Sequence, residues 1–266
     1  MIDIVKSREA FKKYLDSYDN KNDPSFVFKV THTYHVAEAS KDIATKLHLS
    51  EEDILLAELI GLLHDIGRFE ELTITQGFNS LKFDHAEYGV KMLFEDGMIR
   101  DFIDDDQYDE IIKVAIDNHS RFAIEEGLDE RALLHAKIIR DSDKLDNFRV
   151  RKYEKINAFL PTIASTVEEM EKSLISDKVF ETVKQRKCVR VEDRVYPLDY
   201  WICVLAFIFD LNFDVTLKII HDNNYINFLI DRFNYVDAKT QEQMEIIRNI
   251  INNYIDENIN KENLNE

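Results

Sequence analysis

Residues 54–71 read ILLAELIGLLHDIGRFEE, a mostly apolar run that leads into the adjacent pair His64-Asp65. Ser50, with Asp53 three residues later, is a variant of the capping box, so a buried helix is predicted from there to about residue 66. An unpartnered buried carboxylate is costly, which indicates that the pair has a polar or metal partner. Neighbouring side chains on a helix point about 100° apart, and a carboxylate has two oxygens. His64 can therefore face one metal while Asp65 reaches that metal and a second one.

The rest of the 266-residue chain is also expected to be helical. Six Gly and three Pro are too few for the turns of an all-β fold, and helical periodicity recurs almost throughout. Further helix starts are predicted at Asp23-Pro24, Asp84 and Asp129. Residues 67–83 have no clean period and are predicted to be a loop.

The charge balance is strongly acidic, with 34 Lys and Arg against 52 Asp and Glu and a formal net charge of −18. Such a surface disfavours non-specific binding to nucleic acid or to anionic membranes, whereas a bound metal can still attract a small anion locally. The N-terminus lacks the apolar core and cleavage site of a signal peptide, and the longest apolar run is far shorter than the roughly 20 residues of a membrane span. Cys188 and Cys203 form no disulfide framework. We therefore expect a cytoplasmic protein.

Six imidazole and carboxylate side chains fall on or beside predicted helices. In chain order they are His35, His64, Asp65, His85, His119 and Asp143. Imidazole and carboxylate ligands without a thiolate suit Fe, Mn, Co, Ni or Zn. Six ligands are too many for one metal with an open position, and they suit two divalent transition-metal ions that share a carboxylate.

Five segments carry a resemblance to a known family. They are HTYHVAEAS (32–40), LLHDIGRFEE (62–71), KFDHAEYGVKML (82–93), VAIDNHS (114–120) and IIRDSDKLDN (138–147). Together they resemble the HD superfamily of metal-dependent phosphohydrolases over about residues 25–155. The resemblance implies an all-α helical bundle.

The same resemblance implies a ligand set for each metal. The first metal would be held by four residues: His35, His64, Asp65 and Asp143. Asp65 would bridge to a second metal that His85 and His119 complete. The closing pattern of the family favours Asp143 over Asp141 and Asp146, and Asp141 is interpreted as a hydrogen-bond partner of a ligand histidine.

The activity implied is hydrolysis of a phosphate ester or anhydride, in a nucleotide or a similar small phosphorylated metabolite, by a metal-activated hydroxide. Many mononuclear relatives carry Glu where this chain has Arg68, which favours a hydroxide between two metals. We expect Asp65, Arg68 and Lys144 to be catalytic, with Arg68 and Lys144 neutralising the phosphoryl oxygens. His32 stands where many relatives have an Arg three residues before the first ligand, so His32 and Arg121 are further candidate substrate contacts.

Two other functions remain open. Some members of the superfamily hold two irons with the same ligands and activate dioxygen, and the ligand types do not distinguish these from hydrolases. A regulatory domain without activity is disfavoured because it would not need all six ligand positions.

The predicted organisation has four parts. They are an N-terminal helix (1–24), an HD core (25–155), a helical extension packed on that core (156–258) and a frayed tail (259–266). Within the extension, CVRVEDRVY at 188–196 could form one small β-hairpin.

Overall fold

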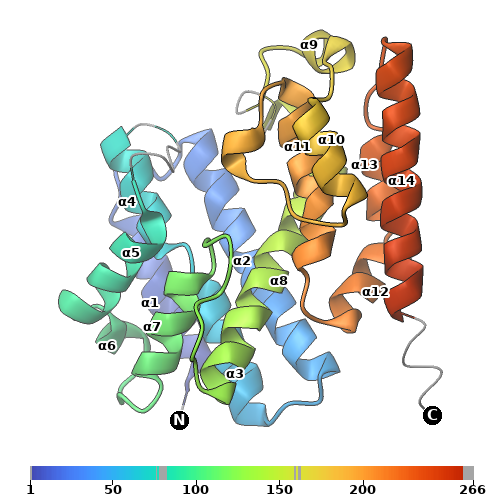
Figure 1. Ribbon diagram of the computed structural model, residues 1–266. Coiled ribbons are helices and arrows are strands. Elements are labelled where there is room, and N and C mark those ends of the chain that lie inside the picture. Colours follow the sequence, from blue (N-terminus) through green and yellow to red (C-terminus); the bar gives the residue numbers. More distant parts are fainter. Residues whose placement is uncertain (1, 76, 78–82, 159, 161–162, 260–266) are drawn as a thin grey trace. The chain divides into compact units, whose positions relative to one another are not determined.

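The computed structural model describes residues 2–75, 77, 83–158, 160 and 163–259. These residues form helices, turns and irregular segments, and no β-strand occurs among them. The predicted all-α class is therefore confirmed. The chain divides into two compact units, Met1–Asp146 and Asn147–Glu266 (Figure 1).

The first unit contains the N-terminal helices and most of the long helix α8. Its elements are α1 (Ile4–Asp16), α2 (Pro24–Lys46), α3 (Glu51–Leu63), α4 (Ile66–Thr75), α5 (His85–Val90), the π-helix η1 (Lys91–Glu95), α6 (Ile99–Phe102), α7 (Asp109–Asn118) and α8 (Glu130–Tyr153). The last turns of α8 belong to the second unit.

The helix starts follow from side-chain caps. The Asp23 carboxylate accepts a hydrogen bond from the Ser25 amide at 2.8 Å, with Pro24 in the first helical position. The Ser50 hydroxyl accepts from the Asp53 amide at 3.1 Å, and Asp84 caps α5 in the same way. The starts predicted at these three positions are confirmed.

Two glycines let helices approach closely where the polar cluster forms. A Cβ atom on Gly61 of α3 would lie 2.7 Å from the Cα atom of Ala37 on α2. A Cβ atom on Gly67 of α4 would lie 2.2 Å from the carbonyl oxygen of His85, at the start of α5. No larger residue fits at either crossing without a shift of the backbone, so these glycines bring α2 and α5 against the segment that carries His64 and Asp65.

The prediction of a loop over residues 67–83 is wrong for its first part, because α4 occupies Ile66–Thr75. Ile66, Phe69 and Leu72 recur at helical spacing and are all buried. The ring of Phe69 packs 4.9 Å from that of Phe26, measured between centroids, and 5.9 Å from that of Phe11. Burial of this apolar stripe against α1 and α2 makes the segment a helix despite its weak sequence periodicity. Residues 76 and 78–82 lie outside the described part of the chain.

The second unit is helical as well (Figure 1). Its elements after α8 are the 3₁₀ turn η2 (Ile156–Ala158), α9 (Val167–Lys172), α10 (Asp177–Lys184), the 3₁₀ turn η4 (Val191–Asp193), α11 (Pro197–Leu205), the 3₁₀ turn η5 (Ala206–Asp210), α12 (Asp214–Asp222), α13 (Tyr225–Ile230) and α14 (Ala238–Ile259). Trp201 is buried, packs on Phe233 with 5.0 Å between ring centroids, and donates its indole N–H to the carbonyl of Leu229 at 3.1 Å.

The β-hairpin predicted over residues 188–196 is wrong, since the segment contains the turn η4 and no strand. Val191 and Val195 are exposed, so the apolar side chains of the predicted hairpin do not form a buried face. The buried Asp199 carboxylate accepts hydrogen bonds from the amides of Val195 and Tyr196, each at 2.9 Å. These bonds tie the segment to the start of α11 instead of to a second strand.

The boundary between the compact units lies inside α8, between Asp146 and Asn147, whereas the predicted core ends at residue 155. The N-terminal helix predicted as a separate segment (1–24) lies within the first unit. The packing of residues 156–258 on the core stays a prediction, and the predicted tail lies outside the described residues beyond residue 259. Across the described helices, none combines the length and apolar character that crossing a bilayer requires.

Candidate metal centre

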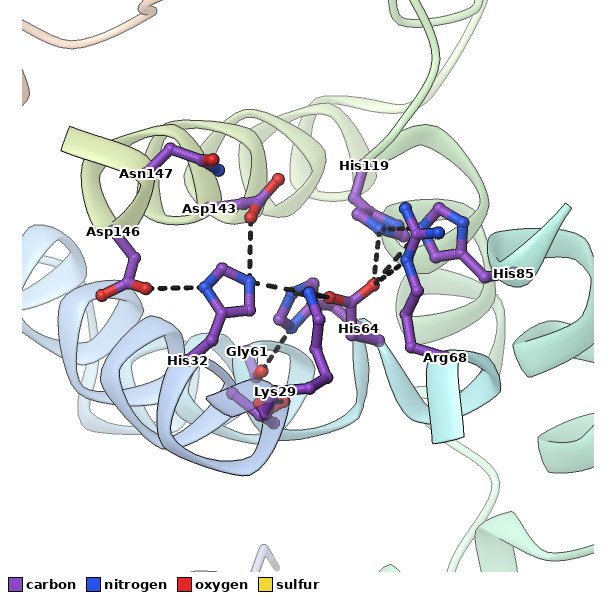
Figure 2. Close-up of polar contacts among 12 residues, drawn as sticks. Lys29, His32, Gly61, His64, Arg68, His85, His119, Asp143, Asp146 and Asn147 are labelled. Carbon is purple, nitrogen blue, oxygen red and sulfur yellow. Dashed lines mark hydrogen bonds and ion pairs between the residues drawn. The ribbon is translucent and has the colours of Figure 1, made fainter. Parts of the chain in front are cut away.

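The Asp65 carboxylate is the centre of a buried polar cluster in the first unit. Its Oδ2 atom lies 3.3 Å from Nε2 of His64 and 3.6 Å from Nε2 of His32. Its Oδ1 atom lies 3.3 Å from Nε2 of His85 and 3.5 Å from Nε2 of His119. Each oxygen of one carboxylate therefore faces a different pair of imidazoles, and Figure 2 shows these pairs on opposite sides of the cluster.

The two sides of the cluster are completed by different contacts. On the first side, Oδ1 of Asp143 lies 3.1 Å from Nε2 of His32. On the second side, the Nε2 atoms of His85 and His119 lie 3.1 Å apart. Among the described residues, two sets of ligand atoms lie close enough together to share an ion, His32 with His64 and Asp143, and His64 with Asp65 and His119.

The donor atoms of this cluster fit a divalent metal. Nε2 of His32, Nε2 of His64 and Oδ1 of Asp65 are buried and make no hydrogen bond within the described residues. Buried polar atoms of this kind are costly unless something else satisfies them. Ligands about 2.0–2.2 Å from a metal lie roughly 3–3.5 Å from one another, and the N···O separations of 3.1–3.6 Å around Asp65 and Asp143 agree with that spacing.

Three of the imidazoles are oriented through their other nitrogen. Nδ1 of His64 donates to the carbonyl of Gly61 at 2.7 Å, and Nδ1 of His119 donates to the carbonyl of Ile116 at 2.6 Å. Nδ1 of His32 lies 2.6 Å from Oδ2 of Asp146. In each ring this contact directs the Nε2 atom toward the cluster, the orientation that metal-binding histidines require.

The charge states favour a cation at the cluster. Burial opposes ionisation of Asp65, but the ammonium group of Lys29 lowers its pKa well below the usual value. Burial lowers the pKa of His64, and it lowers the pKa of His85 to about 2, so both rings are neutral at neutral pH. Burial alone would lower the pKa of His32, but the neighbouring carboxylates of Asp143, Asp146 and Asp65 raise it to about 10. A metal binding at His32 would therefore displace a proton.

Two cationic side chains lie beside Asp65. Nζ of Lys29, on α2, is 2.7 Å from Oδ2 of Asp65, and Nε of Arg68, on α4, is 3.6 Å from Oδ1. Arg68 is held by the fully buried Glu71, whose Oε2 lies 2.6 Å from Nη1 of Arg68. One positive charge thus adjoins each oxygen of the Asp65 carboxylate.

The structure brings together five of the six predicted ligands and leaves out His35. That side chain is 40% exposed, and its ion-pair contact is with Glu38 on its own helix at 3.9 Å. The position predicted for His35 is taken by His32, which had been interpreted as a substrate contact. The reason is helical geometry, because His32 continues the buried stripe of Val36 and Ser40 on α2 whereas His35 lies off it.

Other predicted site residues have different surroundings. Oδ2 of Asp146 contacts Nδ1 of His32, which is a contact of the kind predicted for Asp141, and the role of Asp141 itself stays a prediction. Arg121 is exposed and forms ion pairs with Asp117 and Glu125. Lys144 is buried on α8 beside Asp143. Sequence reasoning missed Lys29, although its spacing of three residues before His32 is the signal that identifies it.

The comparisons with known proteins agree with this geometry. Residues 30–147 match the family model of the HD domain, a span that begins just after Lys29 and ends just after Asp146. No curated protein and no solved structure matched the chain.

Proposed function

This chain belongs to the HD-domain family through residues 30–147, and from that premise we propose that it is a phosphohydrolase that uses two divalent metals. Its substrate would be a phosphate ester or anhydride, in a nucleotide or a similar small phosphorylated metabolite. The observation that carries the proposal is the position of Asp65, whose two oxygens face two separate pairs of histidines at 3.3–3.6 Å.

The proposed ligands divide into two groups around that carboxylate. The first metal would be held by four residues: His32, His64, Asp65 and Asp143. The second would be held by Asp65, His85 and His119. When bound, divalent transition metals supply Lewis-acid polarisation of a phosphoryl oxygen and a water of lowered pKa.

The chain's own cations bind and orient the substrate in this proposal. Lys29 and Arg68 flank Asp65 on its two oxygen sides, so both reach the space where a phosphoryl group would meet the metals. The buried Glu71 holds the Arg68 guanidinium, which lowers the entropy lost when that side chain binds an anion. In a protein of net charge −18, this local positive charge is what attracts an anion.

The same two cations favour hydrolysis over the alternative of a di-iron oxygenase. A phosphoryl group gains charge-assisted hydrogen bonds from an ammonium and a guanidinium beside Asp65, whereas the binding of dioxygen itself, an uncharged molecule, does not draw on them. Lys29 also stands three residues before His32, where many relatives carry Arg. Lys144 and Arg121 stay as weaker candidates for substrate contacts.

The test combines metal analysis with a panel of phosphorylated nucleotides and simple phosphate esters. Wild-type protein is expected to hold two metals per chain and to hydrolyse at least one member of the panel. Asp65→Ala is expected to lose both metals, and His85→Ala to retain one, with the helical circular dichroism spectrum preserved in both. Two metals retained in Asp65→Ala would show that Asp65 does not bridge them.

A further inference from the structure

Arg140 lies on α8 with only 2% of its surface exposed, and its guanidinium contacts main-chain carbonyls at the end of α7. Nη1 donates to the carbonyl of Asn118 at 3.0 Å and to the carbonyl of Arg121. Nη2 donates to the carbonyl of Phe122 at 3.3 Å. One buried side chain thus holds the last residue of α7 and the segment that follows it.

One of these contacts satisfies a group that the helix itself leaves open, the carbonyl of Asn118, the last residue of α7. The last carbonyls of a helix have no partner within it, and they form the negative end of the helix dipole. A planar guanidinium carries several donors in a fixed geometry, so a single arginine can serve three carbonyls at once. The charge and the donors of Arg140 therefore both suit this position.

The carbonyl of Asn118 belongs to the peptide bond that joins it to His119, so Arg140 restrains the backbone of a proposed metal ligand directly. The His119 ring is then set by its own hydrogen bond to the carbonyl of Ile116 at 2.6 Å. Main-chain and ring contacts together place Nε2 of His119 at 3.5 Å from Oδ1 of Asp65.

Arg140 and Asp143 are three residues apart on α8 and share one face of that helix. Asp143 contacts His32 on the first side of the cluster, whereas Arg140 holds the backbone of His119 on the second side. A single rigid helix therefore spans both proposed metal positions.

We infer that Arg140 is a positioning residue that sets the second metal position by fixing His119 relative to Asp143. The inference rests on the proposed two-metal function. Loss of the guanidinium would let the end of α7 move and would weaken the second site selectively, while the first site keeps His32, His64, Asp65 and Asp143 in place.

The experiment titrates metal-free protein with Mn²⁺ and records both the stoichiometry and the electron paramagnetic resonance spectrum, in which two Mn²⁺ ions sharing a carboxylate are spin-coupled. Arg140→Met is expected to bind the second Mn²⁺ at least 10-fold more weakly and to lose the coupled signal at limiting metal. Arg140→Lys is expected to recover only part of the affinity, since one ammonium cannot reproduce the planar fork.

Arg131→Met is the matched control, because Arg131 is a second arginine on α8 and binds the carboxylates of Glu52 and Asp53 instead of the end of α7. It is expected to keep two coupled Mn²⁺ ions. The inference would be overturned if folded Arg140→Met and Arg140→Lys both bind the second Mn²⁺ ion with the affinity of the wild type. If wild-type protein binds only one Mn²⁺, the proposed two-metal function fails and the inference fails with it. If wild-type protein binds two Mn²⁺ and the Arg140 variants bind them equally well, the inference alone fails. The two failures are therefore distinguishable.

Discussion

Oδ2 of Asp146 lies 2.6 Å from Nδ1 of His32, and both groups are buried. A carboxylate on the outer nitrogen of a metal-binding imidazole fixes its tautomer and raises its basicity. Asp146→Asn keeps the shape of the side chain but removes the negative charge. We expect this variant to bind the first metal 10–100-fold more weakly, measured by competition against a chromophoric chelator.

The control for this prediction is another buried histidine that contacts a carboxylate. Nε2 of His135 lies 3.1 Å from Oδ1 of Asp53, outside the Asp65 cluster. Asp53→Asn is expected to leave the affinity for metal unchanged. An equal loss of affinity in both variants would show a general effect of destabilisation and not a specific effect on His32.

Gly67→Ala is predicted to destabilise the first unit. The added Cβ would lie 2.2 Å from the carbonyl oxygen of His85 and 2.8 Å from the amide nitrogen of Gly89, both backbone atoms that cannot rotate away. Helix α5 must shift, and overpacking of this kind costs about 1–3 kcal/mol. Thermal unfolding is expected to show a lowered Tm, and metal analysis a loss of the second metal as His85 is displaced.

Gly77→Ala is the matched control, because its Cβ would meet no atom of the described residues within 4 Å. It is expected to leave Tm and metal content unchanged. A wild-type Tm for Gly67→Ala would contradict the close crossing of α4 and α5.

His135 is predicted to make folding stability depend on pH. Burial lowers its pKa below the usual 6.5, although Asp53 opposes the shift. Below pH 6.5 the unfolded chain therefore binds a proton that the folded protein does not, and stability falls as the pH falls. Each such group contributes a slope of up to about 1.4 kcal/mol per pH unit.

The measurement is the free energy of unfolding by urea between pH 7 and pH 5.5. Metal is removed by chelation, so that the histidines of the Asp65 cluster contribute equally to the pH dependence of every protein compared. His135→Gln is expected to have a shallower pH dependence than wild type. The Asp53 carboxyl, with a pKa lowered to about 2, loses its contribution only at lower pH and does not affect this window.

The features that the sequence predicts correctly are those that depend on short-range physics. Asp23, Ser50 and Asp84 cap helices in the structure as their local sequence predicts, because capping involves residues only two or three positions apart. The all-α class follows from periodicity and from the scarcity of glycine and proline. The pair His64-Asp65 was recognisable because it interrupts an apolar run.

The errors arise where tertiary contacts decide. His32 and His35 are both histidines on α2, and the choice between them depends on which face of the helix meets Asp65 and Asp143. Val36 and Ser40 are buried and follow His32 at intervals of four residues, so the helical spacing places His32, and not His35, on the buried face of α2. Helix α4 was missed because its apolar side packs on aromatic rings far away in the sequence. The partnership of Asp146 with His32 joins residues 114 positions apart, and no local pattern encodes it.

Arg68→Ala is predicted to keep both metals and to lose substrate binding. The guanidinium approaches Asp65 at 3.6 Å without being one of the proposed ligands. Losing a charge-assisted hydrogen bond to a phosphoryl group costs about 1.5–3 kcal/mol, which is a decrease in kcat/KM of about 10–150-fold. Arg68→Lys should recover only part of this, since an ammonium cannot make a bidentate contact. Unchanged kinetics in metal-loaded Arg68→Ala would remove Arg68 from the site.

Lys29→Met is predicted to change metal affinity and catalysis in opposite directions. Nζ of Lys29 lies 2.7 Å from Oδ2 of Asp65, so its positive charge repels a cation bound to that oxygen. Removing the charge should strengthen metal binding, while kcat/KM on the best phosphorylated substrate falls because the phosphoryl group loses an ammonium. Lys41→Met is the matched control on the same helix, because Lys41 contacts the buried Glu58 at 2.9 Å and lies outside the cluster. Mn²⁺ titration and steady-state kinetics on the same preparations test the direction of the change in metal affinity and in kcat/KM. Metal binding that weakens in Lys29→Met would show that Lys29 supports the metal site and does not compete with the metal for Asp65.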